Sequence, residues 1–362
     1  MSIHSESAHI EPCAPADYQL SSAKPRQTGL PRDTAIDFTK GSLVLFMVLY
    51  HWLNYFVGTY GQYYDYLRFL TPSFIFITGF MISQIHLCRY ERSGRSLAKR
   101  LTVRGFKLLA VFLVLNTLAG VWLSRPPVWR AALGRFLHNI CWAFIVANPM
   151  ASEGQKSVSF SMLVPIAYLL ILSAGLVILT RREKYAFGCT LFVLIVAVVL
   201  SRAYEMVNSY LDLLMIGVLG VVIGFGGKAQ KAFVVSHPYV LIALYCCYLA
   251  VITIWGVTLP LQVASVILTT VLLYIAGSSG AARGAALRPT VMVGKYSLLA
   301  YISQIAFLQG LRRISWLTQH GVGALLLALL LGVLLTVLVV EATDVARRKS
   351  RLADDLYRLF FA

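Results

Sequence analysis

Ten apolar segments, each long enough to cross a lipid bilayer, recur along the chain and restrict it to one class of fold. A hydrocarbon core of about 30 Å takes about 20 helical residues to cross. Because lipid cannot bond free backbone groups, each segment must be helical or sheltered by its neighbours. We therefore predict an all-α polytopic membrane protein, a bundle of about ten transmembrane helices at 41–60, 69–87, 106–123, 160–180, 185–200, 210–226, 239–257, 261–277, 291–310 and 322–341.

Composition and charge support this prediction. Hydrophobic residues make up 58% of the chain and charged residues 13%, whereas a soluble domain is about 25% charged. If both termini are cytosolic, the cytosolic segments hold 24 of the 32 lysines and arginines, as the positive-inside rule requires. The net charge of +17 therefore indicates topology, and we expect no nucleic-acid partner.

Segment 135–150 complicates the count of spans. Its apolar run is short, and counting it as a span would place the basic residues of 181–184 outside, against the charge bias. We interpret it as a re-entrant or interfacial helix within a large external loop, 124–159. This loop either forms a binding surface or only caps the bundle.

The remaining segments are less informative. Residues 1–31 are polar and lack the apolar core of a signal peptide, so we expect a disordered cytosolic tail. The transmembrane domain then spans 32–346, and 347–362 form a basic cytosolic C-terminal segment. The six cysteines have no CxxC spacing and indicate packing. We expect neither a metal site nor a bound cofactor.

The first apolar segment carries polar residues on one helix face. Lys40 and His51 are eleven residues apart, which in an α-helix is about 16 Å and about three turns plus 20°. Asp37 and Asn54 extend this face at either end. The ordinary interpretations are a hydrogen-bonded histidine between helices and a lysine that anchors the topology. The functional one is a proton-transfer site joined to a cation that holds phosphates.

Three stretches resemble the acyltransferase-3 family and its relatives, which include glucan succinyltransferases and heparan-glucosaminide acetyltransferases. They are AIDFTKGSLVLFMVLYH (35–51), FLTPSFIFITGFMIS (69–83) and VGKYSLLAYISQIAF (293–307). Many family members have arginine where this chain has Lys40. The late histidine of the family pattern is Gln304 here, which cannot exchange a proton at neutral pH and can at most orient a ligand by hydrogen bonds.

The resemblance implies transfer of an acetyl, succinyl or similar acyl group from cytosolic acyl-CoA, as a co-substrate, to a hydroxyl or amine. The acceptor would be a cell-envelope glycan or a lipid-linked sugar, and the location the bacterial inner membrane. His51 would act as general base, either for direct attack or by way of an acyl-imidazole. The candidate substrate-binding residues are Asp37, Lys40, Asn54, Arg68, Arg104, Lys107, Ser297, Tyr301 and Gln304.

Several of these residues have simpler interpretations. Arg68 and Asp65 could be an interfacial ion pair, and Ser297, Tyr301 and Gln304, spaced i, i+4 and i+7, could only pack between helices. Two other functions also stay open. A secondary transporter or flippase would have similar helices and buried polar residues, and so would a non-catalytic subunit of a polysaccharide-export assembly.

Overall fold

The computed structural model describes residues 33–58, 62–87, 94–123, 144, 160–180, 183–206, 208–226, 236–279, 284, 287–319 and 321–361. Within these ranges every regular element is helical, which confirms the all-α class. The described helices belong to one unit, Thr34–Ala362. The predicted tail 1–31 lies outside the described residues. So does the predicted interfacial helix 135–150, apart from Phe144.

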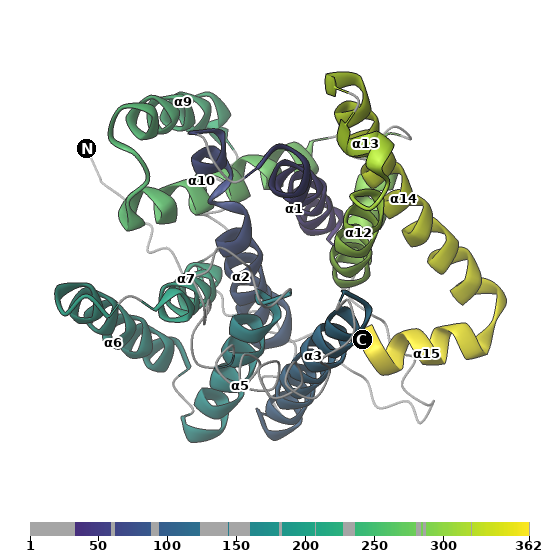
Figure 1. The fold of residues 1–362 in the computed structure, drawn as a ribbon. Helices are drawn as coiled ribbons and strands as arrows, with labels where there is room; N and C mark the ends of the chain where they lie inside the picture. Colours follow the sequence, from purple (N-terminus) through teal and green to yellow (C-terminus); the bar gives the residue numbers. More distant parts are fainter. Residues whose placement is uncertain are drawn as a thin grey trace, which may run out of the picture. The chain divides into compact units, whose positions relative to one another are not determined.

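Helices cover all ten predicted apolar segments (Figure 1). They are α1 (Thr34–Trp52), α2 (Leu70–Met81), α3 (Gly94–Leu123), α5 (Leu163–Leu179), α6 (Glu183–Ala203), α7 (Ser209–Gly224), α9 (Pro238–Trp255), α10 (Leu259–Ser278), α11 (Arg288–Lys295), α12 (Ser297–Leu311), α13 (Ser315–Gln319), α14 (Gly321–Lys349) and α15 (Arg351–Phe361). Two π-helices, η1 (Leu53–Val57) and η3 (Ile82–Leu87), extend α1 and α2, and the 3₁₀-helix η2 (Gln62–Leu67) precedes α2.

Fewer helices meet the length and composition of a full span than the ten predicted. Among the described residues six do so: Tyr63–Gln84, Gly94–Leu118, Glu183–Ala203, Pro238–Trp255, Leu259–Ser278 and Gly321–Lys349. A bent pair, α11 with α12, brings the number to seven. Helices α5 and α7 are apolar but have only 17 and 16 residues. The described part of the chain thus has six or seven helices of spanning length, and the count of ten is not confirmed.

The ninth predicted span is not one straight helix. The sequence predicts a continuous helix over 291–310, but α11 and α12 meet at 97°. The bend falls at Tyr296, whose backbone (φ −110°, ψ 32°) leaves the helical region. Both sides of the bend are held by other helices, because α11 packs on α1 and α12 packs on α14. Tertiary contacts therefore outweigh the local preference for a continuous helix.

Glycines let two helix pairs approach closely. A Cβ on Gly41 of α1 would overlap the carbonyl of Thr290 on α11, and one on Gly294 would overlap the carbonyl of Asp37. A Cβ on Gly79 of α2 would likewise overlap backbone of α7. Small residues at such contacts are typical of membrane helices, whose association depends on close packing.

The interpretation of the cysteines as packing residues is wrong for those that the structure describes. Cys189 on α6 and Cys246 and Cys247 on α9 are free and exposed. They lie on outward helix faces, where they fill no space between helices. Cys13, Cys88 and Cys141 lie outside the described residues.

Candidate functional site

His51 lies in the last turn of α1 among aromatic rings. Its ring centroid is 5.3 Å from that of Tyr50 and 5.9 Å from that of Tyr55, which stacks on it at 19°. Tyr301 of α12 is 6.4 Å away, so two of the predicted site residues come together. Both ring nitrogens of His51 are shielded from solvent. The imidazole therefore lies between α1 and α12, with its nitrogens shielded from solvent.

The helix changes type directly after His51. α1 ends at Trp52 and continues as the π-helix η1, closed by a 2.9 Å bond from the amide of Gly58 to the carbonyl of Leu53. The α-helical spacing that predicted Asn54 on the face of His51 therefore does not hold there, and Tyr55 is the η1 residue that stacks on the imidazole. Single π-turns are frequent at functional sites.

Further rings enlarge this group into an aromatic cluster, comprising Tyr50, His51, Tyr55, Tyr64, Phe160 and Tyr301. Tyr50 and Tyr64 share a hydrogen bond between their hydroxyls, and Phe160 lies 6.2 Å from Tyr301, edge to face. Phe160 has a left-handed backbone (φ 61°), which costs an L-residue about 1–2 kcal/mol. Such strained residues gather at functional sites.

Sequence reasoning identified only part of the aromatic cluster. It singled out His51 and Tyr301, but not Tyr50, Tyr55, Tyr64 or Phe160. Only Tyr55 has a local signal, because it lies one turn beyond His51. Phe160 comes from a distant part of the chain, and the sequence carries no sign of its contact with Tyr301.

Lys40 is fixed by Asp37 at the other end of α1. Its Nζ lies 2.9 Å from Oδ1 of Asp37, and the two side chains are 12% and 6% exposed. The helix is α-helical from Lys40 through His51, so the predicted separation of about 16 Å along the axis holds. The structure thus places a largely buried cation and an imidazole with shielded nitrogens about three turns apart on one helix.

Gln304 is a buried amide on α12. Its exposed fraction is 0%, and neither amide atom has a hydrogen-bond partner among the described residues. An amide in that state costs about 1–3 kcal/mol of stability. Tyr301, one turn earlier, is also buried, whereas Ser297 is partly exposed. Two of the three residues predicted on one face of this helix therefore face the protein interior.

The other predicted cations lie elsewhere on the described chain. Arg68 is exposed and pairs at 3.0 Å with the partly exposed Asp65, which matches the simpler interpretation of an ion pair. Arg104 is exposed on α3. Lys107 of the same helix donates a 3.2 Å bond to the carbonyl of Arg358 on α15.

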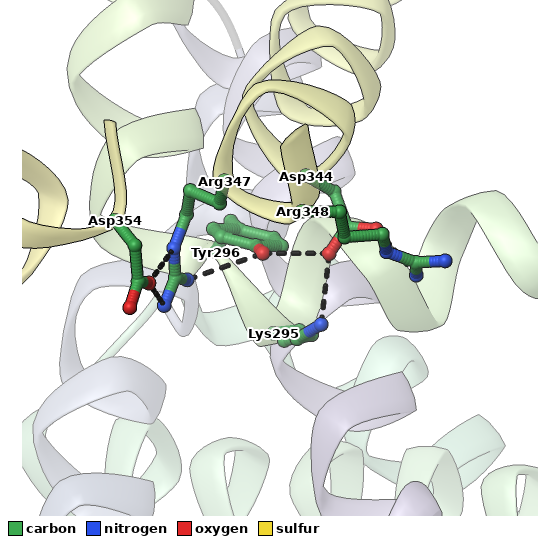
Figure 2. Close-up of polar contacts among 6 residues, drawn as sticks. All are labelled: Lys295, Tyr296, Asp344, Arg347, Arg348 and Asp354. Atoms are coloured by element: carbon green, nitrogen blue, oxygen red, sulfur yellow. Dashed lines mark hydrogen bonds and ion pairs between the residues drawn. The ribbon is translucent and has the colours of Figure 1, made fainter. Parts of the chain in front are cut away.

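A second group of polar residues, absent from the sequence prediction, surrounds the bend between α11 and α12 (Figure 2). Asp344 of α14 accepts bonds from Lys295 Nζ (2.8 Å) and the Tyr296 hydroxyl (2.6 Å), both on one carboxylate oxygen. Arg348 contacts its other oxygen at 2.5 Å. We name Lys295, Tyr296, Asp344, Arg347, Arg348 and Asp354 the ionic cluster.

Arg347 links this cluster to α15. It donates two bonds to Asp354 Oδ1 (2.8 and 2.6 Å) and one to the Tyr296 hydroxyl (3.1 Å). Its guanidinium also lies 4.0 Å from the ring centre of Tyr357. The ionic cluster therefore joins the helix bend, α14 and α15. Its one sequence signal is Asp344, an acid close to the end of a long apolar helix.

Comparisons with known proteins identify no relative. No family model, curated protein or solved structure matches the chain. The resemblance to acyltransferase-3 proteins therefore depends on the three stretches quoted above and on the residues within them.

Proposed function

We propose that the protein is an integral membrane acyltransferase. It would move an acetyl, succinyl or similar acyl group from cytosolic acyl-CoA to a hydroxyl or amine of a cell-envelope glycan or lipid-linked sugar, in a bacterial inner membrane. The observation that carries this proposal is the presence on α1 of both an imidazole with shielded nitrogens, His51, and a largely buried Lys40–Asp37 ion pair. The family resemblance supplies the reaction.

The chemistry assigned to His51 is general-base catalysis. A neutral imidazole takes the proton of the acceptor hydroxyl as its oxygen attacks the thioester carbonyl. The C–S bond then breaks, and the proton passes from the imidazolium to the CoA thiolate. The surrounding rings keep water from competing with the acceptor, and Tyr50 and Tyr64 offer flat apolar surfaces for a sugar ring.

The role assigned to Lys40 is to hold the phosphates of the donor. Asp37 fixes the ammonium, and a fixed charge loses less side-chain entropy when it binds an anion. The carboxylate neutralises part of that charge, so further cations must complete the donor site. Arg104 and Lys107, at the start of the apolar part of α3, are the candidates.

One observation favours a second function. Discontinuous helices line the substrate sites of many secondary transporters, and α11 with α12 forms such a pair. Transporters usually carry a matching break in each half, and α11 with α12 is the one bent pair among the described helices. The experiment must therefore distinguish an acyltransferase from a transporter or flippase.

The test uses the purified full chain in lipid vesicles with acetyl-CoA or succinyl-CoA and extracted envelope glycans. An acyltransferase releases free CoA and adds an acyl mass to the glycan, and His51→Ala abolishes both while the protein still folds. Cys246→Ser, on an exposed helix face, is the control. Full turnover by His51→Ala, or flux of a glycan across vesicles without CoA, contradicts the proposal.

A further inference from the structure

The C-terminal helix α15 has two unlike faces. Four apolar residues of this helix are spaced four, three and one positions apart and so share one face. They are Leu352, Leu356, Leu359 and Phe360. They are 48–71% exposed. Asp354 and Tyr357 lie on the opposite face, where they contact Arg347. The helix is therefore fixed to the ionic cluster on one side and presents a row of apolar side chains on the other. We name that row the apolar face of α15.

Two other helices place α15 at the edge of the hydrocarbon core. The uncharged part of α14 ends at Val340, and α14 itself ends at Lys349, about 14 Å further along the axis, just before α15. At its other end, the carbonyl of Arg358 accepts a bond from Lys107. Lys107 is the last charged residue before the uncharged part of α3. Figure 1 shows α15 turning away from the line of α14 towards α3.

The charge of this region is complementary to anionic headgroups. Residues 347–361 contain five basic and two acidic side chains. Arg348 and Arg358 keep 64% and 65% of their side chains exposed although each contacts a carboxylate. Lys349 and Arg351 are also exposed. A helix with an apolar face and a basic border is typical of a segment that lies in the membrane interface.

We infer that α15 binds the anionic lipid interface next to the end of α14, with its apolar face among the acyl chains and its arginines and lysines at the headgroups. Lipid is favoured over a second protein because only Ser350 separates α15 from a membrane-spanning helix. The helix is thus held at the lipid surface whether or not a partner is present. This inference is independent of the proposed acyl transfer.

Photo-crosslinking of the full chain in lipid vesicles tests this inference. Leu356→p-benzoylphenylalanine, on the apolar face, is compared with Asp355→p-benzoylphenylalanine on the polar border. With phosphatidylcholine and phosphatidylglycerol present, we expect several-fold more lipid adduct at position 356, detected as a lipid mass on the C-terminal peptide. A crosslinked dimer without lipid adduct, or equal adducts at both positions, overturns the inference.

Hydrogen exchange of the unmodified chain gives a second measurement, which does not depend on whether a substituted chain folds. Amides of 352–360 exchange more slowly in vesicles that contain phosphatidylglycerol than in phosphatidylcholine alone. The double substitution Lys349→Gln and Arg351→Gln reduces this difference, because both side chains are exposed and basic. Exchange that does not depend on the anionic lipid contradicts the charge-based recognition.

Discussion

Lys40 and Asp37 form an ion pair of 2.9 Å one turn apart on α1, and both side chains are almost buried. A lysine that only anchors a helix extends its stem towards the headgroups and keeps its ammonium in water. Lys40 instead pairs with the side chain of Asp37. The backbone carbonyl of Asp37 lies against Gly294 of α11. The position of this cation is therefore set by the contact between two helices.

Asp37→Asn weakens the binding of acyl-CoA if Lys40 holds the donor. The ammonium loses its charged partner and is ordered less well, so we expect KM for acyl-CoA to rise about tenfold, or about 1.4 kcal/mol, with a smaller change in kcat. Steady-state kinetics of CoA release measure both constants. Asp65→Asn, which frees the exposed Arg68, is the control. If KM for acyl-CoA is unchanged, the Lys40–Asp37 pair is a structural contact with no part in donor binding.

Gln304→Met separates stability from function. Removing a buried amide that has no hydrogen bond among the described residues should leave stability unchanged or raise it by about 1–3 kcal/mol. Turnover should fall, because the amide no longer orients a substrate. Thermal unfolding and CoA release are measured on the same preparation.

Ser173→Ala is the matched control for that substitution. Ser173 on α5 is also fully buried, and its hydroxyl has no hydrogen bond among the described residues. It should tolerate the change with full activity. If Gln304→Met keeps full turnover too, Gln304 has no part in substrate binding.

Gly294→Ala tests the contact between α11 and α1. The added methyl group overlaps the carbonyl of Asp37, and overpacking of this kind costs about 1–3 kcal/mol or more. We expect a lower thermal midpoint in detergent. Gly175→Ala in α5 is the control, because a Cβ there meets no atom within 4 Å. Equal midpoints for both variants would show that α11 does not pack on α1 in this way.

Asp344→Asn tests the ionic cluster. The carboxylate accepts bonds from Lys295, Tyr296 and Arg348, and its loss should destabilise the protein by about 1–3 kcal/mol. Faster hydrogen exchange in α12 and α15 should accompany the lower thermal midpoint. Asp355→Asn on exposed α15 should change neither quantity. If Asp344→Asn is as stable as the parent protein, the ionic cluster does not stabilise the helix bend.

The apolar segments and the polar face of α1 could be predicted because both depend on local sequence. Hydropathy marks a buried or lipid-facing helix wherever it lies, and residues eleven apart share a face in any α-helix. Helices therefore form at all ten predicted positions, and Lys40 and His51 lie on one continuous helix.

The features that could not be predicted depend on contacts between distant residues. Tyr296 and Asp344 are 48 positions apart, and nothing around Tyr296 predicts a bend. The π-turn after His51 also escapes a pattern based on 3.6 residues per turn. The predicted number of spans exceeds the number of described helices of spanning length in part because hydropathy alone does not separate short apolar helices, such as α5 and α7, from full spans.

The right-angle bend at Tyr296 has a mechanical consequence. Helix α11 packs mainly on α1, and α12 packs mainly on α14, so any relative motion of these two pairs would be absorbed at the hinge between them. The tyrosine at that hinge is bonded to α14 and, through Arg347, to α15. A force applied to the C-terminal helix at the lipid surface would therefore reach the helix that carries Tyr301 against His51.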